Sequence, residues 1–162
     1  MVDAKDSFYI ALRDRLTTLN PQRTMMARGA VRPGILVEEA EPAVSQLPRD
    51  VYVLRWTGVS RDLSLPSRMV MLNCEIHYCT AGSDAACGLD RGRALTTMDS
   101  EVVEMLEPAS TPAMSFDAIP ATATGGTTFW TTPSFGTTII SRDCLGRMAK
   151  VTVFARQAEG DE

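Results

Sequence analysis

The run of alternating residues at positions 68–80, RMVMLNCEIHYCT, constrains the fold of this chain more than any other segment. In an extended strand, Asn73, Glu75, His77 and Cys79 share one face. The opposite face is apolar and carries Val70, Leu72, Cys74, Ile76 and Tyr78. One buried face and one partly wet face are typical of antiparallel or mixed sheets, so the segment predicts a strand in such a sheet.

Three further segments have the residue types of strands. Positions 51–57 (VYVLRWT) are rich in β-branched and aromatic residues, and 145–156 (LGRMAKVTVFAR) alternates again. A shorter strand is expected near 127–132. The connection between 51–57 and 68–80 is long for a hairpin but permits antiparallel pairing of the two strands.

The N-terminal segment predicts an amphipathic helix. Asp6 or Ser7 can cap it, and it ends at Asn20 because the residue before Pro21 is pushed out of the helical region. Its apolar stripe consists of Phe8, Leu12, Leu16 and Leu19.

A second helix is predicted from Asp90, which can cap it, to about Glu107, just before Pro108. Its apolar stripe consists of Leu95, Met98, Val102 and Leu106. The spacing of its carboxylates fits a solvated outer face better than a divalent-ion site. We therefore assign to that outer face Asp99, Glu101, Glu104 and Glu107.

Strands that come in neighbouring pairs between two helices favour an α+β fold over a doubly wound parallel sheet. With 162 residues the chain has the length of one domain, 1–162. We expect a mixed, mostly antiparallel sheet of about four strands with two amphipathic helices on one face. The expected ordered core is 6–156, with long extended loops at 22–50 and 108–138 and a frayed tail at 157–162.

Charge and cysteine content exclude several classes of protein. Sixteen basic residues against twenty acidic ones give a net charge of −4, which argues against binding nucleic acid through bulk charge. No apolar stretch approaches the roughly 20 residues of a membrane span, and the N-terminal segment lacks the apolar core of a signal peptide. Without such segments, we expect a cytoplasmic location. Four cysteines are too sparse for a disulfide scaffold, so we expect free thiols.

The candidate reactive groups surround His77, the only histidine. Cysteine and histidine are zinc ligands, but alternation points Cys74 away from His77 and Cys79, and Cys87 matches no paired-cysteine spacing. A catalytic pair of His77 and Cys79 is disfavoured because same-face neighbours on a strand lie roughly 6–7 Å apart. The sequence also lacks a Gly-rich phosphate loop and a nucleophile elbow. It therefore predicts no catalytic residue, no metal site and no cofactor.

The order of several segments resembles one family. A FYIALRDRL helix is followed by an Arg- and Pro-rich connection, by VLRWT and CEIHYCTAGSD, and then by LDRGRALTTMDSEVVEML and a closing KVTVFAR strand. Over residues 6–156 this order is similar to that of the tail terminator (tail tube capping) proteins of phages and phage-derived tail-like particles.

The resemblance implies a structural virion assembly protein and not an enzyme. Such a subunit forms a homohexameric ring on the tail tube, ends tube polymerisation and provides the surface that joins the head. Its implied partners are further copies of the chain, tail tube and sheath proteins, and neck or connector proteins. DNA is only cargo passing through the lumen, and no membrane is involved. Beside the resemblance, charge repulsion gives a separate hypothesis, in which acidic groups of the second helix keep passing DNA from sticking to the lumen. The implied location is the host cytoplasm during assembly and the neck end of the mature virion tail.

In a ring, the long connections are expected to reach neighbouring subunits. We assign a subunit interface to Arg28, Arg32, Arg91, Arg93, Phe116 and Trp130. Arg91 and Arg93 lie in the first turn of the second helix, where the helix dipole prefers anions. Two compensations are open: local pairing with Asp90 or Asp99, or carboxylates supplied by a neighbouring subunit.

Two other interpretations of function stay open. The chain can be another tail tube or neck (tail completion) component, since these proteins share its size and α+β character. From a different class, it can be a small cytosolic ligand-binding domain or an enzyme with an unrecognised site.

Overall fold

The structure is a computed structural model that describes residues 2–40, 47–62, 64 and 69–156. The described residues form the helices α1 (Val2–Leu19) and α2 (Arg91–Met105) and one 3-10 turn, η1 (Glu38–Ala40). The strands are β1 (Thr24–Ala27), β2 (Ala30–Pro33), β3 (Ile35–Val37), β4 (Tyr52–Asp62), β5 (Met69–Thr80), β6 (Ser110–Ser115), β7 (Thr122–Trp130), β8 (Ser134–Phe135), β9 (Ile139–Ile140) and β10 (Leu145–Arg156). The predicted tail at 157–162 lies outside the described residues, as does 41–46 within the predicted loop 22–50.

Eight strands form one mixed sheet in the order β3-β4-β5-β10-β7-β6, with β8 and β9 also paired to β10. β3 runs parallel to β4, and the other pairs in this sheet are antiparallel. β1 and β2 form a separate antiparallel hairpin. The α+β class with a mixed, mostly antiparallel sheet is confirmed, whereas the expected count of about four strands is wrong.

The additional strands arise largely from the two segments predicted as long loops. The segment 22–50 contains β1, β2 and β3, and the segment 108–138 contains β6, β7 and β8, with β9 just beyond it. β7, β8 and β9 pair one after another with successive parts of β10, so together they form one interrupted strand beside it. β3, β8 and β9 are each three residues or shorter, so alternation could not reveal them. They form because a longer strand offers them its backbone hydrogen bonds, which is a tertiary effect.

The two long strands at the centre match the sequence prediction. β5 and β10 pair without a break from Leu145↔Thr80 to Arg156↔Met69. β5 buries its predicted apolar face, although Cys79, on the other face, is buried as well. β4 pairs antiparallel with β5, as expected, and extends past the predicted 51–57, with a bulge after Trp56.

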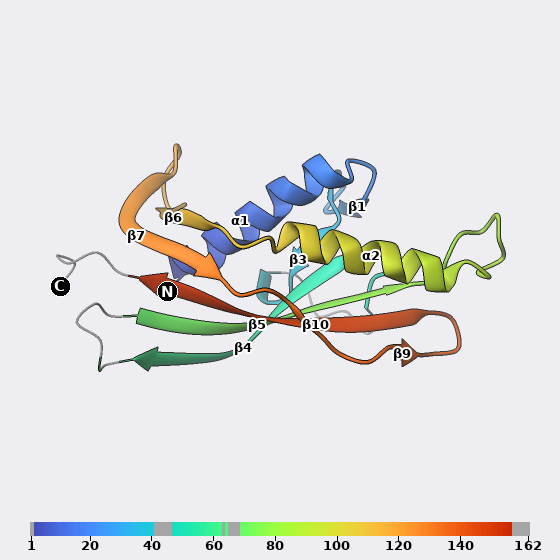
Figure 1. Cartoon of the computed structure of the whole chain (residues 1–162). Helices are drawn as coiled ribbons and strands as arrows, with labels where there is room; N and C mark the ends of the chain where they lie inside the picture. The colour runs from blue at the N-terminus through green and yellow to red at the C-terminus, as the bar shows by residue number, and fades with distance from the viewer. Residues whose placement is uncertain (1, 41–46, 63, 65–68, 157–162) are drawn as a thin grey trace.

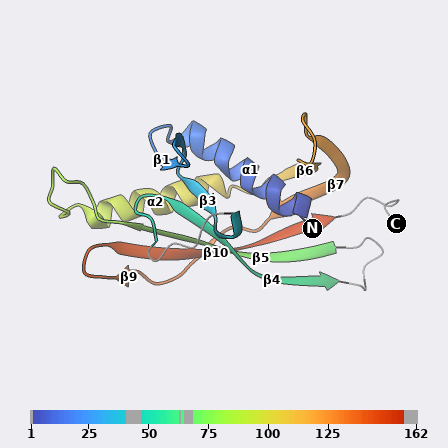
Figure 2. The same cartoon turned by 180° about the vertical axis from the view of Figure 1, so that it is seen from behind.

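Both helices lie on the same face of the sheet, as expected (Figures 1 and 2). α1 begins at Val2, earlier than predicted, and ends at Leu19. Leu19 is 39% exposed and does not belong to the core, whereas the other three residues of the predicted stripe are fully buried. Phe8 contacts the edges of Trp56 and Trp130 at ring-centroid distances of 5.8 and 5.4 Å, so α1 packs across the middle of the sheet.

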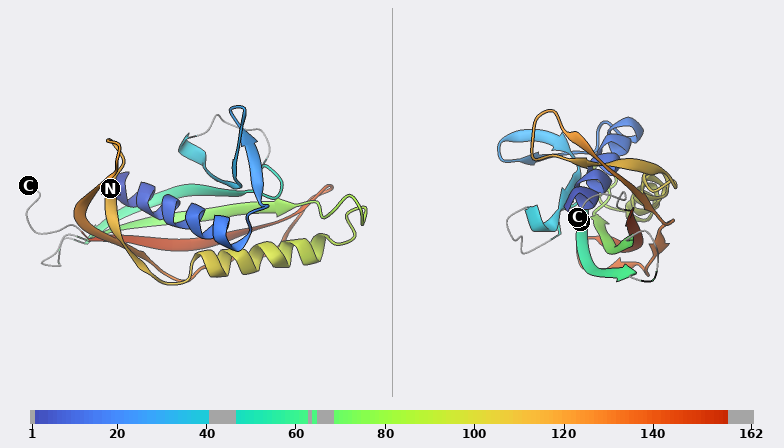
Figure 3. Two further views of the ribbon diagram at one scale, coloured as in Figure 1. Left: turned by 90° about the horizontal axis from the view of Figure 1, so that it is seen from above. Right: turned by 90° about the vertical axis from the view of Figure 1, so that its left-hand side faces the viewer.

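α2 buries its whole predicted apolar stripe against β5 and β10. Figure 3 shows the β1–β2 hairpin projecting from one side of the molecule and α2 lying along the opposite side. In the part of the chain that the structure describes, no helix is both long enough and apolar enough to span a membrane.

Candidate functional site

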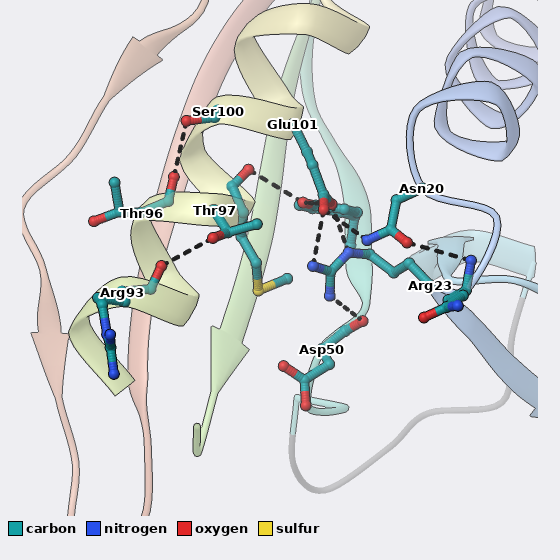
Figure 4. Close-up of polar contacts among 11 residues, drawn as sticks. Asn20, Arg23, Asp50, Arg93, Thr96, Thr97, Ser100 and Glu101 are labelled. Carbon is teal, nitrogen blue, oxygen red and sulfur yellow. Dashed lines mark hydrogen bonds and ion pairs between the residues drawn. The ribbon is translucent and has the colours of Figure 1, made fainter. Parts of the chain in front are cut away.

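A carboxylate on α2 is the centre of a buried polar cluster (Figure 4). Glu101 accepts hydrogen bonds from Arg23 Nε at 2.5 Å and Nη2 at 3.0 Å, from the Tyr52 hydroxyl at 2.6 Å and from Asn20 Nδ2 at 2.8 Å. Its side chain is only 10% exposed and that of Arg23 only 11%. The predicted assignment of Glu101 to a solvated outer face is therefore wrong.

The hydrogen bonds decide the charge state of this cluster. Burial alone raises the pKa of Glu101, but the hydrogen bonds from Arg23, Tyr52 and Asn20 and the charge of Arg23 outweigh it, so the pKa lies below its usual value. Burial and the hydrogen bond to Glu101 raise the pKa of Tyr52. Glu101 is thus an anion matched by one cation and two neutral donors, an arrangement typical of a structural anchor.

The Glu101 cluster fixes the base of the β1–β2 hairpin. Arg23 directly precedes β1, and its carbonyl accepts a 2.8 Å hydrogen bond from the backbone N–H of Gly34, directly after β2. Its guanidinium also donates to the carbonyl of Asp50 at 3.2 Å. The backbone of Arg23 thereby joins the two ends of the hairpin, and its buried side chain ties them to α2 and to the residue two positions before β4.

The hairpin has two different faces. Met25 packs on a small apolar cluster that consists of Leu36, Val51 and Val53. Met26 and Val31 are directly paired across the two strands and are 64% and 66% exposed. We call these two residues the hairpin pair. The two-residue turn has positive φ at Arg28 (50°) and Gly29 (80°), as in the tight turns that match strand twist.

A second anchor holds the β8–β9 segment. Asp99 of α2 accepts a 2.5 Å hydrogen bond from the Tyr78 hydroxyl and lies 3.0 Å from Arg147 Nε. The guanidinium of Arg147 donates to the carbonyl of Gly136 at 2.8 Å and to the hydroxyl of Thr138 at 3.1 Å. The side chains of Arg147 and Asp99 are 22% and 23% exposed, so this anchor is shallower than the first. The adjoining strand β9 exposes Ile139 (58%) and Ile140 (79%).

The predicted interface residues divide into two groups. Arg28, Arg93 and Phe116 are exposed, and Arg32 and Arg91 are half-buried. These five come from three separate places: the hairpin, the first turn of α2 and the β6–β7 connection. The structure does not bring them together into one site.

Trp130 is a correction to the predicted interface. It is 4% exposed, packs against Phe8, and lies beneath the guanidinium of Arg15, which is 5.3 Å from the ring centroid. An aromatic residue at the end of a strand that faces the helices joins the core, so Trp130 cannot serve as an exposed contact.

The local explanation for the arginines at the start of α2 applies only at a distance. Hydrogen bonds from Ser83 lower the pKa of Asp90, and the charge of Arg93 adds to this effect. Asp90 is the N-cap residue by position, but its carboxylate makes no capping hydrogen bond and accepts the backbone N–H of Ser83 at 2.8 Å. Asp99 is paired with Arg147. Among the described residues, neither Arg91 nor Arg93 forms an ion pair with either aspartate.

The groups considered for metal binding and catalysis do not converge. Cys74 faces the core, and burial raises its pKa to about 12. His77, on the opposite face, contacts Glu75 at 2.9 Å. Burial and the nearby Cys144 thiol raise the pKa of Cys79 to about 12. No group of three potential metal ligands occurs among the residues that the structure describes.

A shallow depression of about 370 Å³ lies on the sheet face opposite the helices. Its wall is mostly hydroxyl and amide groups from Thr57, Asn73, Thr131 and Thr152, with Lys150 as its one cation among the described residues. It includes no histidine, and its only thiol, that of Cys74, is protonated and faces the core. Its lining also contains the Ser134 hydroxyl and the carboxylate of Glu75, which contacts His77. Among the described residues, no hydrogen bond joins this carboxylate to a hydroxyl of the lining.

No family model matches this chain, and a search of curated proteins likewise returns no significant match.

The role of Glu101 as the centre of an anchor was not predicted from the sequence. The signal was present, because Glu101 follows Met98 by three positions and precedes Met105 by four, and both of these are buried. Residues at that spacing share a helix face. A carboxylate on a buried helix face requires partners, and Arg23 and Tyr52 provide them.

Proposed function

We propose that this chain is a structural subunit of a self-assembling ring, specifically a tail terminator that caps a tail tube. The observation that carries the proposal is the presentation of apolar side chains on short segments that polar anchors tie to α2, a buried anchor for the hairpin and a shallower one for β9. The hairpin pair is held through Arg23 and Glu101, and Ile139 and Ile140 through Arg147 and Asp99.

Such anchoring is what an assembly subunit requires. A segment that is already ordered loses little conformational entropy when it binds, so more of the contact energy stabilises the assembly. An exposed apolar pair that served only the monomer would cost solubility without a gain in stability. The order of helix, strands, helix and strands over residues 6–156 supports the tail terminator among possible ring proteins.

Deletion of the gene for this chain from the phage or tail-like particle that encodes it tests the specific function. For a terminator, we expect tail tubes of uncontrolled length, and addition of the purified protein should restore a uniform length. Absence of all tubes would indicate a tube subunit, and tails of normal length that fail to join heads would indicate a neck protein. Either of these results would overturn the terminator proposal.

Native mass spectrometry tests the ring itself. Six subunits of 17.6 kDa correspond to a species of about 106 kDa. Electron microscopy of the same sample, alone and with tubes, should show a closed ring. A protein that stays monomeric at high concentration and also fails to bind tubes would contradict the assembly function.

A further inference from the structure

The tip of the β1–β2 hairpin is built as a contact surface. The hairpin pair is exposed on the face that points away from the body of the protein, whereas Met25 on the other face packs on the small apolar cluster. Arg28 occupies a left-handed backbone conformation, with φ of 50°, that favours glycine or asparagine over arginine. In the described part of the chain it has no ion-pair partner, so the fold gives no reason for an arginine at this turn.

The outer face of α2 has complementary chemistry. The hydroxyls of Thr96, Thr97 and Ser100 bond to the carbonyls four residues earlier in the helix, so they present methyl and methylene groups outwards. Val103 follows on the same face and is 50% exposed.

Beyond Val103, the same helix face becomes acidic. Glu104 is exposed within α2 and Glu107 is exposed just after it. Neither carboxylate has an ion-pair partner among the residues that the structure describes. The surface therefore offers an apolar patch beside two free anions, which matches an apolar pair beside a free cation.

These two surfaces lie on opposite sides of the molecule. Both views in Figure 3 show the hairpin projecting away from the side along which α2 runs. They cannot meet within one subunit, but they can meet between two subunits. A contact between different surfaces of identical subunits is head-to-tail, and it closes into a ring when the repeated rotation completes a full turn without a rise.

We propose that the β1–β2 hairpin of one subunit docks on the outer face of α2 in a second copy of this chain. The hairpin pair covers Val103 of the second copy, and Arg28 pairs with Glu104 and Glu107. This inference rests on the proposed ring function and names the contact that builds the ring. It also gives the free carboxylates of α2 a role in the subunit interface instead of in the lumen.

Charge exchange is the first test. Arg28→Glu should weaken assembly about tenfold or more, and so should the double replacement Glu104→Arg with Glu107→Arg. Combining all three substitutions should restore assembly, which a general loss of folding could not do. Arg142→Glu, at an exposed turn residue, is the matched control and should leave assembly unchanged. The readout is the mass distribution in native mass spectrometry over a dilution series.

Cross-linking in trans is the second test. Met26→Cys protein is mixed with Val103→Cys protein, both carrying Cys87→Ser and Cys144→Ser to remove the accessible thiols. A short bismaleimide should join the two variants rapidly, alone or on tubes. Val59→Cys, which replaces a residue with 49% exposure on β4, serves as control in place of Met26→Cys and should not react with Val103→Cys.

The outcomes separate this inference from the proposed function. If rings form but neither Arg28→Glu nor the double replacement at Glu104 and Glu107 affects them, and the cross-link is absent, the hairpin contact is wrong while the ring function stands. If no oligomer and no tube-bound ring form at all, both proposals fail. Rings that are lost when the charge is reversed on either surface alone, and that return when all three substitutions are combined, would establish the contact.

Discussion

The two anchors of α2 contain the same three groups, a tyrosine, a carboxylate and an arginine, yet they differ in depth. In the first, the side chains of Arg23 and Glu101 are 11% and 10% exposed, and Glu101 accepts four hydrogen bonds. In the second, Arg147 and Asp99 are 22% and 23% exposed, and Asp99 accepts one hydrogen bond, from Tyr78. The comparison shows that solvent access, more than composition, sets the role of such a cluster.

The physical reason is the balance between desolvation and pairing. A buried charge is tolerated only when its lone pairs are matched, and removal of one partner then leaves an uncompensated ion. A half-exposed carboxylate can exchange a lost partner for water. We therefore infer that the first anchor holds the hairpin rigidly and that the second lets the β8–β9 segment adjust.

Glu101→Ala is expected to have the largest effect, because it leaves Arg23 buried without a counter-charge. The free energy of unfolding should fall by about 3–5 kcal/mol. Urea denaturation followed by far-UV circular dichroism measures the change. Asp143→Ala, at an exposed carboxylate outside both anchors and the proposed contact, is the control and should stay within about 0.5 kcal/mol of the parent. A loss below about 1 kcal/mol for Glu101→Ala would contradict the anchor role.

Acidification should remove the stability that ionised Glu101 contributes to the deeper anchor. The pKa of Glu101 is lower in the folded protein than in the unfolded chain. The stability that this carboxylate contributes is therefore present above the usual pKa of glutamate and is lost as the pH falls through the folded-state value. Unfolding free energies measured from pH 7 to pH 3 should decline less steeply for Glu101→Gln than for the parent protein. Parallel curves for the two proteins would show that Glu101 does not titrate as proposed.

Asp99→Asn should have a smaller and more local effect. It removes the charge opposite Arg147 but leaves an oxygen for the Tyr78 hydroxyl, so we expect a loss of about 1–2 kcal/mol. Hydrogen exchange should accelerate at Ile139 and Ile140 while the amides of the hairpin keep their protection. Equal acceleration in both segments would remove the distinction between the two anchors.

A surface ion pair should contribute the least to the free energy of unfolding, because it is the most exposed to solvent of the pairs compared. Arg55 and Glu38 form two 2.7 Å hydrogen bonds, but their side chains are 48% and 47% exposed. Arg55→Ala should reduce the free energy of unfolding by about 0–1 kcal/mol, and high salt should cancel the difference. A larger, salt-independent loss would mean that solvent access does not set the value of these pairs.

Periodicity predicted the elements whose own residues contain the folding information. The alternation of β5 and β10 indicated two strands, and the spacing of Leu95, Met98 and Val102 indicated the buried face of α2. In these elements the burial of each core-facing apolar side chain stabilises the fold, so apolar residues recur in the sequence with the period of the strand or helix. The family resemblance and the ring stay predictions, which the experiments above address.

The tertiary structure alone decided the remainder. β3, β8 and β9 exist only through pairing with a longer strand, and Trp130 became core because α1 covers it. The partners of Glu101 lie 49 to 81 positions away in the chain, so no local pattern could join them. Short-range periodicity indicates which side chains are buried. Which distant segments pair depends on how the helices and strands pack against one another, and no local pattern contains that information.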